Sequence, residues 1–423
     1  MRRLTIAVII VLGLPEFLRA DFEAGAAKIE ITPPIGYPMW GYSSRKDKPS
    51  AGVRDPLNAR ALVLKSGNGK IALVSLDLGR APTRDSMKRI RDALKDSGFA
   101  EIFLVASHTH HGPVIEIETW PKEGKPYVRE LEEKLVAVIR KADAARKPAR
   151  YGVGSTEVTF NRNRQSKRKD APVDRELAVL RVEDAEGKPI AHAVNFAAHP
   201  TMLPANLMQF SADFPGAMAK RVEAETVVPC LFLQGAAGDL SANPPEGVKG
   251  PDEFGKTLGD SALSLAKEIK MNGKGTSLVT RREEFKFEIV IDVNNVLVRA
   301  ALEQAFFPDL IAFFQKEYAG GVRPVISTAV LDGSLGFVGV SGEFFSEHAL
   351  SLKRRARLPH LFVLGYCNDY QQYFPTIQAV SEGGYGTGLP VAVTELGAGE
   401  RMIDRALIHL YQLRGLVPEG GGK

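Results

Sequence analysis

Cysteine is almost absent from this chain of 423 residues, which contains only Cys230 and Cys367. Two cysteines can form at most one disulfide, so the chain cannot be a small scaffold held together by disulfides. Both cysteines lie in apolar segments typical of strands. The sequence leaves open whether they pair in an oxidising compartment or remain buried free thiols.

The chain also lacks blocks of like charge, internal repeats and low-complexity linkers. Its net charge is +5 and its isoelectric point is about 9.0, and no long block of consecutive lysines and arginines concentrates that charge. Because no basic stripe is interleaved with aromatic residues, nucleic-acid binding is not expected. The charge is explained by a solvated basic surface, with peripheral contact to an anionic membrane surface as the alternative. The hydrophobic and charged fractions, 44% and 25%, are those of a folded globular protein.

Only one segment has the composition of a targeting sequence. Arg2 and Arg3 precede an apolar run from Leu4 to Leu14, and a small residue, Ala20, follows shortly after. This order is typical of a secretory signal, and the run is too short for an ordinary membrane span. We therefore predict a signal peptide over residues 1–20 and an exported protein, secreted or periplasmic, with retention as an anchor left open.

The rest of the chain predicts a single α/β domain over residues 21–417, followed by a short tail at 418–423. Apolar strand-like and helix-like segments alternate from end to end, which favours a mixed β-sheet core flanked by helices. Strands are expected at 71–76, 102–106, 151–159, 177–182, 190–196, 229–234, 277–290, 325–330, 335–340 and 361–365. Helices are expected at 84–94, 127–142, 212–224, 253–270, 296–317, 343–357 and 392–415.

Three of only eight histidines fall in one tetrapeptide, His108-Thr109-His110-His111, directly after a predicted strand. Functional groups of α/β proteins gather at the carboxyl ends of strands. If the backbone stays extended, His108 and His110 point to the same side. One of them would then suit a metal, and the other would suit proton transfer or substrate contact.

Further polar residues follow other predicted strands. His199 follows the strand at 190–196, and Glu343 follows the strand at 335–340, where it is expected to open a helix with Glu347 one turn along. Two histidines and a carboxylate from separate strand ends form a typical catalytic zinc set, which leaves one position for water. Two more turns follow strands in the same way, at 234–243 and at 368–373. The small residues of the first turn permit close backbone approach, and the second brings Tyr370 and Tyr373.

Taken in chain order, these segments resemble the neutral/alkaline non-lysosomal ceramidase family. The matching stretches are Ser107–His110, Asn161-Arg162, His199, Gly238–Asn243, Gly342–Phe344 and Asn368–Tyr373, with further likeness at Gly41-Tyr42 and at 52–61. They keep the family's order over residues 25 to 400.

The resemblance implies a zinc hydrolase of N-acyl amide bonds that converts ceramide to a fatty acid and a sphingoid base. One zinc ion per chain would be held by His108, His199, Glu343 and Tyr373, and a zinc-activated water would attack the carbonyl. His110 and Arg162 would face the amide and Ser241 would lie in the pocket, while Tyr370 and Tyr385 are candidates for substrate contact. His110 would protonate the leaving amine, and Arg162 or Tyr373 would stabilise the oxyanion. Ser241 either binds substrate or attacks it, and water is the preferred nucleophile.

The sequence also departs from the family. The chain stops just after its terminal helix, so we expect no C-terminal β-sandwich domain, and the stretch after Tyr373 is shortened. His111 and Val114 stand where small residues are usual, which would narrow the pocket mouth. A lipid-like substrate such as ceramide is the first expectation. The alternatives are another amide or ester, or a non-catalytic exported binding protein; the oligomeric state is left open.

Overall fold

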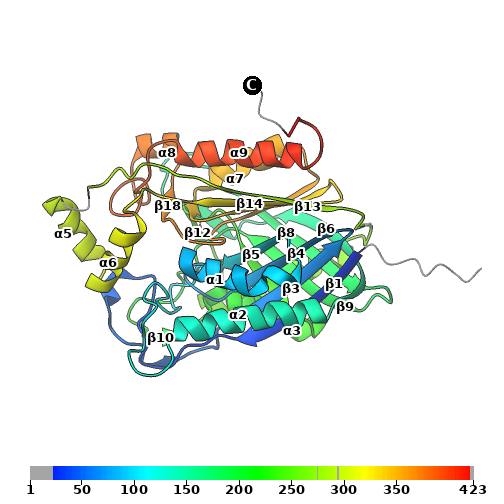
Figure 1. The fold of residues 1–423 in the computed structure, drawn as a ribbon, viewed down its shortest axis with the longest axis horizontal. Helices are drawn as coiled ribbons and strands as arrows, with labels where there is room; N and C mark the ends of the chain where they lie inside the picture. The colour runs from blue at the N-terminus through cyan, green and yellow to red at the C-terminus, as the bar shows by residue number, and fades with distance from the viewer. Residues whose placement is uncertain (1–21, 274, 293–294, 420–423) are drawn as a thin grey trace, which may run out of the picture.

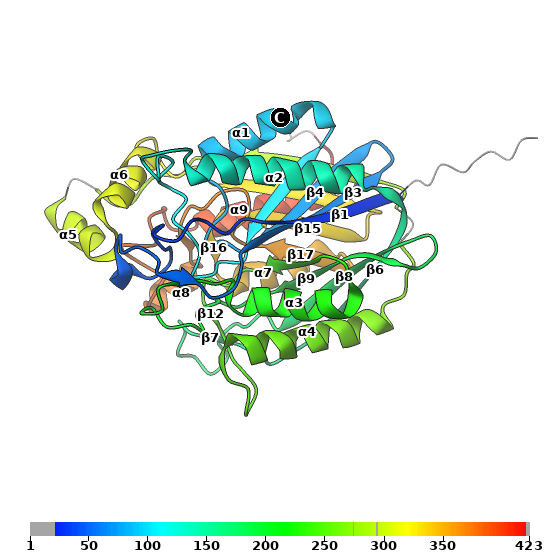
Figure 2. The ribbon, with the colours of Figure 1, turned by 90° about the horizontal axis from the view of Figure 1, so that it is seen from below.

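The computed structural model describes residues 22–273, 275–292 and 295–419. Within them two β-sheets lie face to face between two layers of helices (Figures 1 and 2). The predicted signal segment, residues 1–20, and positions 420–423 of the predicted tail lie outside the described residues. Among the described helices, none is long and apolar enough to cross a membrane.

The larger sheet has eight strands in the order β11-β9-β8-β6-β1-β3-β4-β5. Their bounds are β1 Phe22–Glu30, β3 Asn58–Ser66, β4 Gly69–Leu76, β5 Glu101–Ala106, β6 Lys147–Glu157, β8 Glu176–Asp184, β9 Pro189–Phe196 and β11 Cys230–Gln234. The pairs β4–β5 and β9–β11 are parallel, and the other neighbours are antiparallel. All six residues of β5 are buried, as expected of a strand covered on both faces.

The smaller sheet has four strands in the order β13-β14-β15-β17. Their bounds are β13 Leu278–Glu284, β14 Val325–Leu331, β15 Leu335–Val340 and β17 His360–Leu364. One apolar core fills the space between the two sheets; it includes Leu62 and Leu64 of β3 and Phe337 of β15. Ala61 and Val63, the alternate residues of β3, face the helices on the other side. The mixed sheet flanked by helices is therefore confirmed, and the second sheet adds a layer that the sequence did not reveal.

Helices cover the outer face of each sheet. The larger sheet carries α1 Arg84–Leu94, α2 Tyr127–Ala144, α3 Asp213–Thr226 and α4 Gly250–Glu268. The smaller sheet carries α7 Ser346–Ala356 and α9 Ala398–Gln412, at the top of Figure 1. Helix α1 begins where the sequence predicted, because the Thr83 hydroxyl accepts the Ser86 backbone N–H at 3.3 Å.

Three predicted helices differ from the structure, and the terminal one, expected over 392–415, spans only Ala398–Gln412 in α9. The helix expected over 296–317 is two helices, α5 Val296–Ala305 and α6 Pro308–Glu317, because Pro308 lacks the N–H that would continue the first and is suited to begin the second. The helix expected to open at Glu343 begins at Ser346, and Glu343 lies in a short strand instead. Strands β1 and β3 were not predicted.

Three short two-stranded ribbons and one short helix complete the fold at the end of the sheets that carries the polar turns. The ribbons pair β2 Gly52–Val53 with β10 Gln209–Phe210, β7 Asn161–Asn163 with β12 Leu240–Ala242, and β16 Glu343–Phe344 with β18 Tyr373–Phe374; the helix is α8 Ile377–Glu382. Cys230 and Cys367 are both buried and free, so in this structure they do not pair.

Candidate metal centre and active site

Two histidine loops meet although they follow distant parts of the larger sheet. His108 follows β5 at one edge of the sheet, and His199 follows β9 near the other edge. The edge strand β11 contacts β3, β4 and β5, which brings the two ends together. The buried Gln234 at the end of β11 links them, because its Nε2 donates to the carbonyls of Ser107 (3.0 Å) and Ala198 (2.8 Å).

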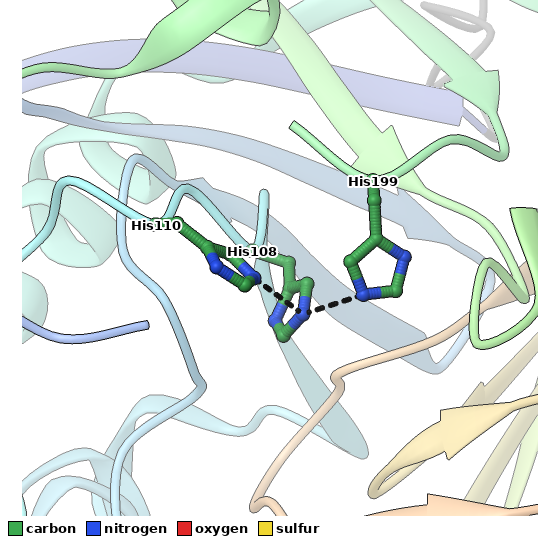
Figure 3. A group of neighbouring side chains, drawn as sticks. All are labelled: His108, His110 and His199. Atoms are coloured by element: carbon green, nitrogen blue, oxygen red, sulfur yellow. Dashed lines mark hydrogen bonds between the residues drawn. The ribbon is translucent and has the colours of Figure 1, made fainter. Parts of the chain in front are cut away.

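His108, His199 and Glu343 converge on one point. The Nε2 atoms of His108 and His199 are 3.1 Å apart, and Glu343 Oε2 lies 3.3 Å from the first and 3.0 Å from the second. All three residues are at most 2% exposed. Figure 3 shows His108 between His199 and His110, whose Nε2 is 3.4 Å from that of His108. The nitrogens of these three histidines could together hold a metal ion.

Backbone carbonyls fix how the two buried imidazoles present their nitrogens. His108 Nδ1 lies 2.7 Å from the Gly79 carbonyl, and His199 Nδ1 lies 2.6 Å from the Ala237 carbonyl. A carbonyl only accepts, so each Nδ1 carries a proton and each Nε2 is the nitrogen that faces the cluster. This outer hydrogen bond is the arrangement that orients metal-binding histidines. Burial, followed by the charge of Arg164, lowers the pKa of His199 to about 3, which keeps its imidazole neutral.

Glu343 is held by the strand pairing and by two phenols. In the parallel ribbon β16–β18 it lies directly beside Tyr373. The Tyr366 hydroxyl donates to Glu343 Oε2 at 3.3 Å, and the Tyr370 hydroxyl donates to Oε1. Glu347 does not support this carboxylate; it is paired with Arg354 on the surface, because the helix starts later than predicted.

Tyr373 also reaches the cluster. It is 3% exposed, and its hydroxyl lies 3.5 Å from His199 Nε2. Burial, and then the charge of Glu343, raises its pKa well above the ordinary value, so the phenol keeps its proton. Of the four ligands that the resemblance implied, three therefore share one point and the fourth lies beside it.

The arginine at the cluster is Arg164, not the expected Arg162. Arg162 is exposed, whereas Arg164 Nη2 lies 2.8 Å from His199 Nε2 and 3.0 Å from the Tyr373 hydroxyl. In β7 the alternation turns Asn161 and Asn163 inward and Arg162 outward. The side chain of Asn163 then accepts the N–H groups of residues 165 and 166, and this turn directs Arg164 inward. The repeated Asn-Arg pair was the signal that sequence reasoning missed.

His110 and His111 point to different places. The predicted extended backbone is absent, because His108 has a positive φ of 67°. His110 still reaches the cluster; it lines the central pocket, and its Nδ1 is buried without a hydrogen-bond partner. The Nε2 of His111 lies 2.6 Å from the buried guanidinium of Arg45, which also donates to the Ala205 carbonyl. His111 thus helps to hold the loop instead of narrowing the pocket mouth.

The turn at 234–243 packs closely against the ribbons around the cluster and stabilises them. A Cβ on Gly238 would lie 2.6 Å from the Glu343 carbonyl oxygen, so only glycine permits this close approach. The buried Asp239 accepts from the backbone N–H and hydroxyl of Ser346 and so caps α7. Ser241 lies in β12 beside His199, partly exposed, and its hydroxyl makes no hydrogen bond to the described residues.

The loop that carries the tyrosines is strained. Tyr366, Asn368 and Gln372 have φ values of 54°, 60° and 63°, a region that side chains rarely adopt. A buried ion pair holds the loop: Arg80 Nη2 lies 3.0 Å from the Asp369 carboxylate, and both side chains are almost fully buried. Such strain gathers at functional sites, where surrounding contacts enforce it.

A cavity of about 620 Å³ opens beside the cluster. Its inner wall includes His110, Glu343 and Tyr373, and both tyrosines expected to touch substrate, Tyr370 and Tyr385, line it. Tyr370 is buried against Glu343, whereas Tyr385 is 62% exposed. The rest of the lining is mixed: its apolar residues include Met39, Val114, Phe306, Phe307, Leu310, Phe314 and Val391, and its polar residues include Ser43, Lys46, Glu116, Gln304 and Gln372. The cavity joins polar, metal-binding chemistry to a space suited to hydrocarbon.

The chain is similar to known proteins in sequence and in fold. Residues 22–244 match the family model of the neutral/alkaline non-lysosomal ceramidase N-terminal domain. The fold is similar to the crystal structure of neutral ceramidase from Pseudomonas aeruginosa, with a TM-score of 0.78 and 19% identity over 96% of this chain and 76% of that chain. It is also similar to a ceramidase complexed with C2, with a TM-score of 0.76 and 19% identity over 96% of this chain and 77% of that chain. At this identity the structural likeness concerns the fold.

Proposed function

The chain belongs to the neutral/alkaline non-lysosomal ceramidase family, and from that membership we propose that it hydrolyses the N-acyl amide bond of ceramide with zinc as cofactor. The observation that carries the proposal is the convergence of two imidazoles and a buried carboxylate beside a cavity with many apolar lining residues. The apolar lining residues, among them Phe306, Phe307 and Leu310, favour a substrate with hydrocarbon chains over a sugar or peptide derivative.

The residues present fit a zinc ion. The Nε2 atoms of His108 and His199 lie 3.1 Å apart, with the Glu343 carboxylate within 3.3 Å of both. Two imidazoles and a carboxylate are typical zinc ligands, and the Tyr373 hydroxyl completes the proposed set. A zinc ion bound there would polarise a carbonyl and lower the pKa of water to about 7.

The other residues near the cluster then have specific roles in the proposed hydrolysis. Arg164 Nη2 and the Tyr373 hydroxyl, 3.0 Å apart, form a pair of donors that can stabilise negative charge on the carbonyl oxygen of the amide. His110 lines the cavity and can deliver a proton to the departing amine, because an amine leaves only when protonated. Tyr366 and Tyr370 hold the Glu343 carboxylate in place.

The decisive experiment measures metal content and catalysis together. Purified protein is analysed for zinc and assayed for release of fatty acid from labelled ceramide, alongside His108→Ala and Glu343→Ala. We expect about one zinc per chain, cleavage by the wild type and loss of both in each variant. If zinc is present but ceramide is not cleaved, the substrate is another amide or an ester. Absence of both zinc and cleavage would overturn the proposal and favour a binding protein.

We further propose that the protein is exported. The support is the basic and apolar order of residues 1–20, which lie outside the described residues. Cell fractionation and sequencing of the mature N-terminus test this proposal. Cytoplasmic protein with an intact N-terminus would contradict it.

A further inference from the structure

Helix α5 leaves most of its apolar residues in contact with solvent. Seven of its ten residues are apolar, but Leu302 alone is buried. Val296 and Leu297 are 79% and 80% exposed. Single exposed apolar residues are ordinary, whereas a helix with this composition and so little burial indicates a surface that is covered in use.

The exposed face of α5 continues the wall of the cavity. Leu297, Ala301 and Ala305 are four residues apart and therefore share one face of the helix. Ala301 and Ala305 line the cavity, so Leu297 extends the same wall outward. Figure 1 shows α5 and α6 protruding at the end of the molecule that carries β12 and β18 (at the left of the view).

A second segment adds apolar surface at the same cavity. Tyr385 and Leu389, which follow α8, line the cavity and are nevertheless 62% and 52% exposed. The Tyr385 ring lies over the Arg164 guanidinium at 5.5 Å, which fixes it at the mouth. Apolar side chains from two separate segments thus surround the entrance to the metal centre.

We propose that α5, together with Tyr385 and Leu389, is a docking surface for a lipid bilayer, from which the substrate passes directly into the cavity. This inference rests on the proposed function, because it assumes a substrate that resides in a membrane. A protein partner seated on the same surface would cover the mouth through which substrate must enter. A bilayer covers it and supplies the substrate at the same time.

The charges of this region specify the kind of bilayer. Residues 296–317 contain two basic residues, Arg299 and Lys316, and three acidic ones, Glu303, Asp309 and Glu317. Lys46, which donates to the Glu303 carbonyl, adds a third basic side chain, so the charges balance and form no basic cluster. Surfaces that select anionic lipids carry clusters of lysine and arginine instead. The docking surface therefore binds through apolar contact, and its affinity for neutral phosphatidylcholine depends little on salt.

The test is co-sedimentation of the full chain with phosphatidylcholine vesicles that contain no ceramide. The double variant Val296→Glu, Leu297→Glu should reduce the partition coefficient by about tenfold or more, because two apolar side chains that enter the interface become charged. Leu416→Glu is the matched control: Leu416 is 57% exposed, near the other end of the chain. It should bind vesicles like the wild type.

Catalysis provides a second readout. Cleavage of ceramide in vesicles should fall with the double variant, while cleavage of a short-chain ceramide dissolved in detergent should not. The proposal would be overturned if the wild-type protein did not co-sediment with the vesicles. It would also be overturned if the double variant bound them as well as the wild type does. So would ultracentrifugation showing a dimer that the double variant disrupts. Because the binding assay contains no substrate, its outcome is independent of whether the protein cleaves ceramide.

Discussion

The guanidinium of Arg164 and the hydroxyl of Tyr373 lie 3.0 Å apart beside His199. The two residues come from chain segments separated by about half the sequence, and both contact the histidine that closes the metal centre. Under the proposed function, a fixed cation and a neutral phenol in this position would stabilise a developing oxyanion. Several measurable consequences follow from this centre.

Replacing Arg164 by methionine should lower kcat for ceramide by roughly 10² to 10³, the usual loss when a donor to an oxyanion is removed. Arg162→Met is the matched control, since Arg162 is two positions away and exposed. It should leave kcat within about twofold. Equal losses in the two variants would show that Arg164 does not act at the amide.

Tyr370→Phe should weaken zinc binding by about 10- to 100-fold, because the Tyr370 hydroxyl donates to the Glu343 carboxylate. Zinc affinity is measured by competition with a chelator of known affinity. Tyr411→Phe removes a phenolic hydrogen bond to the Arg355 carbonyl instead and should not change that affinity. Unaltered binding in Tyr370→Phe would mean that the strand pairing alone positions Glu343.

Ser241→Ala tests which group attacks the amide. The Ser241 hydroxyl makes no hydrogen bond to a base among the described residues, so it has no activating partner. We therefore expect water to attack and kcat to fall by no more than about tenfold. A fall of several thousandfold, together with a trapped acyl-enzyme in the wild type, would identify Ser241 as the nucleophile.

Stability should decrease below neutral pH because buried histidines fold in the neutral form. Burial, and then the charge of Arg181, lowers the pKa of His192 to about 4, and this residue lies away from the metal centre. Below about pH 6.5 the unfolded chain binds a proton at His192, whereas the folded chain does so only near pH 4. Stability is therefore retained above pH 6.5 and lost as the pH falls towards 4.

Urea unfolding at pH 7.5 and pH 5.0 measures this effect. His192 should account for about 2 kcal/mol of the difference between the two pH values. His192→Gln should reduce the difference by that amount, whatever its effect at neutral pH. An unchanged difference in the variant would show that His192 is protonated in the folded state.

Local patterns in the sequence were sufficient for much of the fold. Continuous apolar runs marked β5 and β9, and the Thr83 cap marked the start of α1, because these signals act within a few residues. The same patterns failed where distant pairing decides. Glu343 resembles the start of a helix locally, but it lies in β16 because β18 pairs with it.

The sequence by itself determined which chemical groups the protein has: histidines, a carboxylate and tyrosines after strands, in the order of one enzyme family. Only the tertiary structure decided which of them meet. The contact of β11 with β3, β4 and β5 brings His199 to His108, and the turn at Asn163 selects Arg164 over Arg162. Neither could be read from sequence spacing. Both depend on contacts between residues far apart in the chain, whose free energy appears only once the two sheets have packed.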